Sequence, residues 1–438
     1  MAALALMTAA CSNDDNEITQ QTQKGGGITI TAQLAPKTNG ADTRAVSPAT
    51  DKIVSEWAVG EKIAILYEVN NVKKETDATI IAVSDGTDGK AKGTATIEFS
   101  VANGTADNTA CTLVYPAKLS DNTTTVYKDD LSGLKDYATL FPSGTQDGTL
   151  NTNMDIREGA GTIQTSTPSL TVTTQPAAQY AIFKFTIQDI NGNSKNATAF
   201  KLNKVGDTSE TEIFTFSLAT NDGTSEFYYV LPVLSAGKYW FYATIGGKPY
   251  IAKATLGTAT VAGKYYPTTV IMATVGDALI KPSASSNEFK FATAGTSGAV
   301  ATIAYVVDAS DATGDNHGLA LALADENSSL ELSWQDAIDV CGNKTPKLDG
   351  ATWKLLSEPE WMSIIGGATG SDLSALANLL TLEYTSELIL YWSSSNDPNY
   401  PTTNALAISF YNGNPYSDSK AKDAMYPYRR ICRAGLAF

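Results

Sequence analysis

The sequence predicts a mainly β protein that ends in an α+β domain, and three observations indicate this class. Short stretches rich in β-branched and aromatic residues recur between turns of Gly, Asn, Asp and Ser. Helical periodicity is scarce before about residue 280. The two segments with clear helix signals lie after a Ser/Pro/Ala-rich stretch near residues 282–287, so we expect a separate domain over residues 286–438.

Composition excludes several classes of function. The chain of 438 residues has a formal net charge of −15, which argues against nucleic acid as a partner because phosphate binding needs clustered Lys and Arg. His317 is the only histidine, so metal sites built on several histidines are excluded, as are histidine-based nucleophilic triads away from it. Glu358 and Glu360 have a structural explanation at the start of a helix. We expect no catalytic residue, no enzyme activity and no cofactor.

The N-terminal residues 1–27 are expected to be a signal and a tether. The run "MAALALMTAAC" ends in small residues before Cys11 and is followed by "SNDD". This pattern resembles the box of bacterial lipoproteins, in which the cysteine becomes the acylated first residue. Residues 12–27 would then form a polar, Gly-rich tether. The alternative is an ordinary secretory signal, from which Cys11 is removed.

Two antiparallel β-sandwiches are expected after the tether, over residues 28–165 and 166–279. In "GITITAQL", Ile28, Ile30 and Ala32 alternate with polar residues, which is the period of a half-buried strand. The polar "GAGTIQTSTP" suggests a junction near residue 166. Further strands are expected at residues 62–69, 111–117, 169–175, 181–190, 212–219, 227–234, 238–245, 250–256 and 265–273.

The C-terminal domain is expected to contain two helices. Ser333 is a good N-cap for the first, and Cys341 falls on its apolar stripe, so we expect this thiol to face the core. Ser357 and Glu360 form a capping box for the second helix. Strands are expected at residues 316–323, 388–395, 404–412 and 426–438.

The β segments resemble the fimbrillin-like (Mfa-like) surface lipoproteins, which are pilin precursors. The motifs "ADTRAV", "SEWAVGEKIAILY", "TLVYPA", "AQYAIFKFTI", "FYYVLPV" and "AGKYYP" appear in the order of that family, over residues 28–275. The resemblance implies two tandem transthyretin-like β-sandwiches. It also implies that a trypsin-like protease cuts past the first strand, which leaves with the lipid and is replaced by a donor strand from the next subunit.

The strand at residues 28–34 is the candidate for removal in this scheme. The candidate cut follows Arg44, in a polar, Gly-containing stretch of the kind where proteolysis concentrates, and Lys37 is the next candidate. The alternative is that Arg44 is a solvated linker residue and the strand stays in place.

The last domain resembles C-type lectin-like domains. The order Trp-x-x-Ala-x-x-x-Cys, "WKLLSEPEW", "YWSSS" and "YRRICR" carries this resemblance over residues 300–438. It implies a disulfide bond between Cys341 and Cys432, and the alternative is two reduced thiols in contact in the core. Cys111 is interpreted as a buried strand thiol.

A ligand site is expected in the loops of this domain. Asn396, Asp397 and Asn399 offer oxygen ligands in "SSSNDPNY", and Tyr400 adjoins them. Tyr416 and Asp418 lie in a second segment. The Trp-Asn-Asp tripeptide of calcium-dependent lectins is absent, so we expect a solvated turn and no metal site, with Ca²⁺ as the less favoured alternative.

These expectations combine into a fimbrial (pilus) tip or minor subunit. The protein would be exported as an outer-membrane lipoprotein precursor, accept a donor strand from another fimbrial subunit after proteolysis, and adhere to a host glycan or protein through its lectin-like head. The final strand lies inside a compact domain, which indicates a subunit that accepts a strand and does not give one. The alternative is a lipid-anchored surface glycan-binding protein that does not polymerise.

Overall fold

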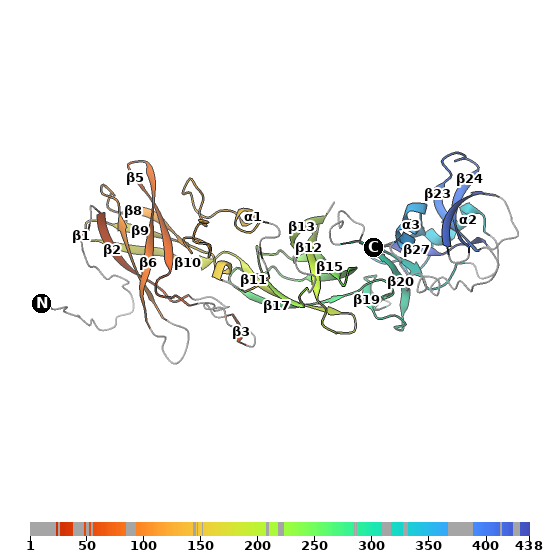
Figure 1. Cartoon of the computed structure of the whole chain (residues 1–438), viewed down its shortest axis with the longest axis horizontal. Coiled ribbons are helices and arrows are strands. Elements are labelled where there is room, and N and C mark those ends of the chain that lie inside the picture. The colour runs from red at the N-terminus through yellow and green to blue at the C-terminus, as the bar shows by residue number, and fades with distance from the viewer. Residues whose placement is uncertain are drawn as a thin grey trace. The chain divides into compact units, whose positions relative to one another are not determined.

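The fold is mainly β, as the sequence predicts (Figure 1). It divides into two compact units: Met1–Phe185, Phe227–Ala236 and Thr258–Thr268 form unit 1, and Thr186–Glu226, Gly237–Gly257 and Thr269–Phe438 form unit 2. The computed structural model describes residues 23–24, 27–37, 48–49, 52–53, 56–84, 93–142, 146, 148–150, 152–206, 210–217, 223–283, 285, 287–308, 317–326, 332–366, 389–411, 414–423 and 430–438.

Unit 1 is built on one eight-stranded antiparallel sheet in the order β1-β2-β7-β6-β5-β8-β9-β10. Its strands are β1 (Gln23–Lys24), β2 (Gly27–Leu34), β5 (Lys62–Val69), β6 (Val72–Val83), β7 (Ala95–Val101), β8 (Thr109–Tyr115), β9 (Arg157–Gln164) and β10 (Ser169–Ala178). The short elements β3 (Pro48–Ala49), β4 (Lys52–Ile53), α1 (Tyr137–Leu140) and the 3-10 turn η2 (Thr152–Met154) lie outside it.

The hairpin of β9 and β10 continues the first sheet across the expected junction at residue 166. Ser169 pairs with Gln164 on either side of a short turn, so the sheet extends to Ala178. The glycines of "GAGTIQ" lie in β9, and they are needed there because β10 passes very close to their backbone. A Cβ at Gly159 would lie 2.6 Å from the Thr174 carbonyl oxygen, which no side chain tolerates. The division of the chain into three domains remains a prediction.

Two further sheets follow in the chain. The strands β11 (Ala181–Asp189), β14 (Glu226–Leu231) and β17 (Tyr265–Met272) form a sheet in the order β14-β11-β17, through which the division between the units passes. In unit 2, β12 (Ala197–Val205), β13 (Glu210–Ser217), β15 (Gly237–Ile245) and β16 (Lys248–Leu256) form an antiparallel sheet in the order β13-β12-β15-β16. Tyr239, Trp240, Phe241 and Tyr242 of β15 are all buried, so both faces of this strand are covered.

The C-terminal part of unit 2 combines two sheets and two helices. The larger sheet has the order β19-β18-β20-β21-β27-β22 and the smaller one β25-β24-β23-β26. Their bounds are β18 (Ala278–Ile280), β19 (Lys290–Ala292), β20 (Ala299–Val306), β21 (Gly318–Ala322), β22 (Thr352–Leu355), β23 (Ile389–Asn396), β24 (Asn404–Tyr411), β25 (Asn414–Ala421), β26 (Arg430–Ile431) and β27 (Ala434–Ala437). Figure 1 shows α2 and α3 beside these sheets.

Both helices form where the sequence predicts them. Helix α2 (Trp334–Gly342) starts at Ser333, whose Oγ accepts a hydrogen bond from the Asp336 backbone N–H at 3.2 Å. Helix α3 (Glu358–Gly366) has the expected capping box, since the Ser357 N–H donates to Glu360 Oε2 at 2.8 Å. The predicted buried face of α3, formed by Trp361, Ile364 and Ile365, is confirmed.

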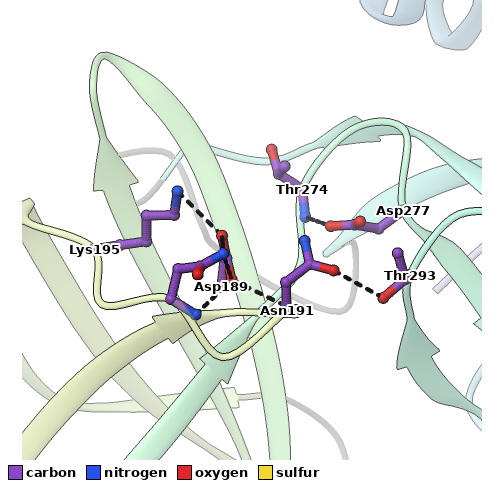
Figure 2. Close-up of polar contacts among 7 residues, drawn as sticks. Asp189, Asn191, Lys195, Thr274, Asp277 and Thr293 are labelled. Atoms are coloured by element: carbon purple, nitrogen blue, oxygen red, sulfur yellow. Dashed lines mark hydrogen bonds and ion pairs between the residues drawn. The ribbon is translucent and has the colours of Figure 1, made fainter.

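A turn after β11 contacts the loop that follows β19, within unit 2 (Figure 2). Asp189 closes this turn, because its carboxylate accepts hydrogen bonds from the Asn191 and Asn193 backbone N–H groups, each at 2.9 Å. Lys195 Nζ lies 3.1 Å from the same carboxylate. Thr293 Oγ1 then donates to Asn191 Oδ1 at 3.2 Å, so the ordered turn presents its amide to the next sheet (Figure 2).

His317 lies in the core that β15 shares with the C-terminal sheets of unit 2. Its ring stacks on Trp240 with centroids 4.0 Å apart, and its Nδ1 lies 2.6 Å from the Tyr242 hydroxyl. Its Nε2 lies 3.3 Å from Glu210 Oε1. Burial, assisted by the positive charge of Lys253, lowers the pKa of His317 to about 4.

This burial predicts an unusual titration for the only histidine. Between about pH 6.5 and pH 4 the unfolded chain binds a proton at this position and the folded chain does not, so His317 should lower the free energy of unfolding by up to about 3 kcal/mol as the pH falls. An NMR titration of the single imidazole should give a midpoint near 4. The loss of stability should be smaller in His317→Gln. A midpoint at or above 6.5 would show that an ionised Glu210 keeps the ring protonated.

Candidate functional site

Strand β2 is paired along its whole length on one side only. Its residues from Ile28 to Leu34 form an antiparallel ladder with β7. On the other side, among the residues that the structure describes, it pairs with the two residues of β1 and lies near β10 without forming a ladder. The predicted period of two is confirmed, since Ile30, Ala32 and Leu34 are at most 2 % exposed and the residues between them face outward. These side chains therefore fill apolar sockets in the core of the first sheet.

Removal of β2 would have two physical consequences. It would uncover the sockets of Ile30 and Leu34, each of which stabilises the fold by about 1.5–3 kcal/mol when filled. It would also leave a row of N–H and C=O groups on β7 without partners. An open strand edge beside empty apolar sockets is a template for the addition of another strand.

The end of β2 is held by a buried cation. The Lys37 side chain is 0 % exposed, and its Nζ lies 2.7 Å from Asp155 Oδ2. The same ammonium lies 4.1 Å from the ring centroid of Trp57 and 4.2 Å from that of Tyr115. Arg157 Nε donates to the other Asp155 oxygen at 2.7 Å. We call Trp57, Tyr115 and Asp155 the Lys37 socket.

Further hydrogen bonds fix the backbone just before the socket. Trp57 Nε1 donates to the Ala35 carbonyl at 3.0 Å, and the Ala35 N–H donates to Gln175 Oε1 of β10 at 3.2 Å. Lys37 is also the second candidate for cleavage predicted from the sequence. That choice is wrong for the folded chain, because a trypsin-like protease must bind a lysine side chain that is buried here. Arg44 and Cys11 lie outside the described residues.

The last strand, β27, is paired on both sides. It lies between β21 and β22, and Leu436 and Phe438 are 0 % and 2 % exposed. The Phe438 carbonyl accepts hydrogen bonds from the N–H groups of His317, at 2.7 Å, and Gly318, at 3.1 Å. Both edges of β27 are therefore in use within unit 2.

Cys341 and Cys432 meet in the core between α2 and the chain leading into β27. Both are 0 % exposed, and their Sγ atoms lie 3.6 Å apart, which is contact between thiols and longer than the roughly 2.05 Å of a disulfide bond. The contact with Cys432, followed by burial, raises the pKa of Cys341. Cys111 lies apart from this pair in β8, where burial raises its pKa to about 12.

The loop after β23 uses its polar side chains to hold itself. Asp397 is buried, and its carboxylate accepts hydrogen bonds from the Asn399 N–H, at 2.7 Å, and from the Ser419 hydroxyl of β25. The Ser419 hydrogen bond, with that of Asn399, lowers the pKa of Asp397. Asn396 Oδ1 accepts from Lys422 Nζ at 2.6 Å. These hydrogen bonds stabilise the turn.

The other candidates are spread along the same sheet. Tyr400 is 62 % exposed in the β23–β24 loop, and its carbonyl accepts the Asn404 N–H at the start of β24. Tyr416 is 41 % exposed and pairs with Ser409 of β24. Ser409 lies five residues after Asn404, so Tyr416 is about 16 Å along the strand from the β23–β24 loop. Asp418 forms an ion pair with Lys420 at 2.6 Å. The structure thus groups Asn396, Asp397, Asn399 and Tyr400 and places Tyr416 away from them.

Unit 2 contains a groove of about 910 Å³ that was not predicted from the sequence. Its walls include Trp240, Lys253, Phe289, His317 and Asp349. Lys253 Nζ lies 3.3 Å from the ring centroid of Phe289, and burial lowers the pKa of Lys253 to about 8. The run "KYWFYATI" carries the signal, since four consecutive aromatic residues cannot all serve one face of a strand.

Neither a cluster of metal ligands nor a membrane-spanning helix is found in the part of the chain that the structure describes. No three His, Cys, Asp or Glu side chains gather there as metal ligands would. None of the helices observed among the described residues combines the length and the apolar character needed to cross a bilayer.

Comparisons with known proteins give only distant similarities. No protein-family model and no curated protein matches the chain. Among solved structures, a fimbrial protein from Bacteroides ovatus is similar, with 12% identity, a TM-score of 0.25, and 88% of this chain and 96% of that one covered. A fimbrial assembly protein from Parabacteroides distasonis has 13% identity and a TM-score of 0.31 over 56% of this chain and 90% of that one. The C-terminally truncated tip fimbrial protein Mfa3 from Porphyromonas gingivalis has 8% identity and a TM-score of 0.27, covering 60% and 99%. TM-scores this low do not establish a shared fold.

The contact between Cys341 and Cys432 predicts a bridge under oxidising conditions. Mild oxidation of the folded chain should join these two residues and should raise the free energy of unfolding by about 4–5 kcal/mol, because the bond closes a loop of about 90 residues. Peptide mapping without reductant and denaturant unfolding measure both effects. The gain should vanish in Cys432→Ala. A bridge that involves Cys111 instead would contradict the assignment.

The hydrogen bonds of Asp397 predict a structural role for this carboxylate. Asp397→Ala should lower the free energy of unfolding, because the Asn399 N–H and the Ser419 hydroxyl lose their shared acceptor. The exposed Asp423 is the matched control, and Asp423→Ala should have little effect. Thermal unfolding with and without Ca²⁺ completes the test. A stabilisation by Ca²⁺ that Asp397→Ala abolishes would instead support a calcium site.

Proposed function

We propose that this protein is a fimbrial subunit that accepts a donor strand at the place now filled by β2. One observation carries the proposal: β2 fills the sockets of Ile30, Ala32 and Leu34 while it forms a full ladder with β7 alone. A strand held in this way can be replaced by another strand with the same apolar period. Main-chain hydrogen bonds would then provide the affinity for the new strand, and no catalysed reaction is needed for this exchange.

Export as a surface lipoprotein is the first step of the proposed pathway. Cys11 would carry the lipid and anchor the precursor in the outer membrane. Cleavage after Arg44 would separate the lipid and β2 from the rest of the chain, because both lie on the N-terminal side of that bond. The cell surface and the fimbrium are therefore the two proposed locations.

A position at the tip, or as a minor subunit, is the finer part of the proposal. Pairing of β27 with both β21 and β22 supports it, because this strand cannot be donated without opening the C-terminal sheet. Residues 286–438 would then form a lectin-like adhesive head. The exposed Tyr400 supports this role, since tyrosine offers a large contact area at a low cost in conformational entropy.

A second candidate function is a lipid-anchored, non-polymerising surface protein that binds glycan. Burial of Lys37 beside Asp155 favours it, because this contact keeps β2 in the sheet. The two functions differ in one measurable property, which is whether the N-terminal segment is cut and exchanged.

Limited trypsin digestion of the folded chain should cut first after Arg44. On the producing cell, the cut protein should move from the membrane to the sheared fimbrial fraction, because the lipid and β2 are on the other side of the cut. Arg44→Gln should remain in the membrane fraction. The exposed Lys118 provides the matched control, and Lys118→Gln should behave as the unmodified chain.

The opposite result identifies the second candidate. A protein that stays uncut and monomeric at the surface, with the same distribution in Arg44→Gln, would contradict the fimbrial role.

A further inference from the structure

We infer that the Lys37 socket is a recognition site for a cationic side chain of the incoming donor strand. The occupant is an extended segment of another subunit that carries Lys or Arg three positions after its last buried apolar residue, as Lys37 follows Leu34. The inference rests on the proposed function, because a strand must replace β2 for the socket to change its occupant.

The socket is built for a cation by geometry. Two aromatic rings, Trp57 and Tyr115, pack edge to face with centroids 5.2 Å apart and place Lys37 Nζ 4.1 and 4.2 Å from their centroids. The negative faces of such rings attract a cation, and more strongly when water is excluded. Asp155 supplies the opposite charge at 2.7 Å, and its side chain is only 8 % exposed.

The charge of Asp155 also favours a cation from the occupant. Asp155 is shared by Lys37 and Arg157, and both cations lie 2.7 Å from it. Glu61 is close enough to respond: burial raises its pKa, and the charge of Lys37 acts in the opposite direction. Without Lys37, Asp155 would lose one of its two cationic partners in a buried site, which is costly unless a new cation arrives.

Space at the socket allows either basic residue. A cavity of about 70 Å³ lies beside the lysine and is lined by Ala35, Trp57 and Gln175 among others. The guanidinium of arginine is larger than an ammonium and stacks well on aromatic faces, so it fits the same partners.

The other positions of the occupant follow from β2. Ala32 is buried between the large side chains of Ile30 and Leu34, so the occupant is expected to carry a small side chain at this position. A Cβ at Gly27 would lie 2.8 Å from the Val101 carbonyl oxygen, so this position also requires a very small residue. The expected donor therefore reads Gly-x-x-large-x-small-x-large-x-x-Lys/Arg.

Peptide competition on the full chain, cut after Arg44, tests the inference. Fluorescent peptides with the sequence of residues 27–37 are added after trypsin is inhibited, and their binding is followed by anisotropy. The native peptide and Lys37→Arg should replace the bound segment. Lys37→Met, of similar length and no charge, should bind about 100-fold more weakly. Gln33→Met is the matched control at an outward-facing position and should bind like the native peptide.

The possible results separate the inference from the proposed function. Binding of Lys37→Met within about threefold of the native peptide overturns the cationic socket and leaves strand acceptance intact. Failure of every peptide to bind, together with no release of the native segment, overturns both. Where trypsin does not make the cut, a site-specific protease sequence in place of residues 40–44 makes it. The Lys37→Met chain should then release its own segment about 100-fold faster, and equal release rates overturn the socket.

Discussion

The first sheet depends on a strand that has a full ladder on only one of its two edges. Strand β2 obtains its main-chain hydrogen bonds from β7, its apolar burial from Ile30 and Leu34, and its end contact from Lys37. Each of these can be supplied by another chain, because a ladder needs only a backbone and a socket needs only a side chain of the right size and charge. Retention and replacement of β2 would thus be governed by the same contacts, and the proposed cleavage after Arg44 would decide between them by removing the covalent connection.

The C-terminal part of unit 2 is arranged in the opposite way. Strand β27 is paired with β21 and β22, and Phe438 closes the sheet onto the backbone of His317 and Gly318. His317 in turn stacks on Trp240, so the C-terminal sheets and β15 share one core. A force on the proposed adhesive head would be carried into β15 by this shared core. The groove beside Trp240 lies in the same region of unit 2.

The sequence predicted the strands whose apolar pattern is strong and missed those whose pattern is interrupted. Strand β5 lies at residues 62–69, as predicted, because it is almost continuously apolar. Most of strand β9 was interpreted as part of a junction, because "GAGTIQTSTP" is polar and precedes a new run of strands, and the glycines, Gly159 among them, gave no sign of a strand. Only contact with β10 shows why they are needed. The Lys37 socket could not be predicted, since Asp155 is 118 residues away and a buried lysine is rare. Of the candidate ligand residues, only the consecutive ones at 396–400 lie together.

Hydrogen–deuterium exchange of β7 tests the central claim most directly, because these amides lose their partners if β2 can leave the sheet. In the chain cut after Arg44, exchange should become faster at Ala95–Val101 and in β2. Exchange at β5 and β8 should stay as slow as in the uncut chain. Added peptide of residues 27–37 should restore protection of β7. If protection is instead lost across all the described strands of the first sheet at once, β2 is an integral part of the fold, and strand acceptance at this position is contradicted.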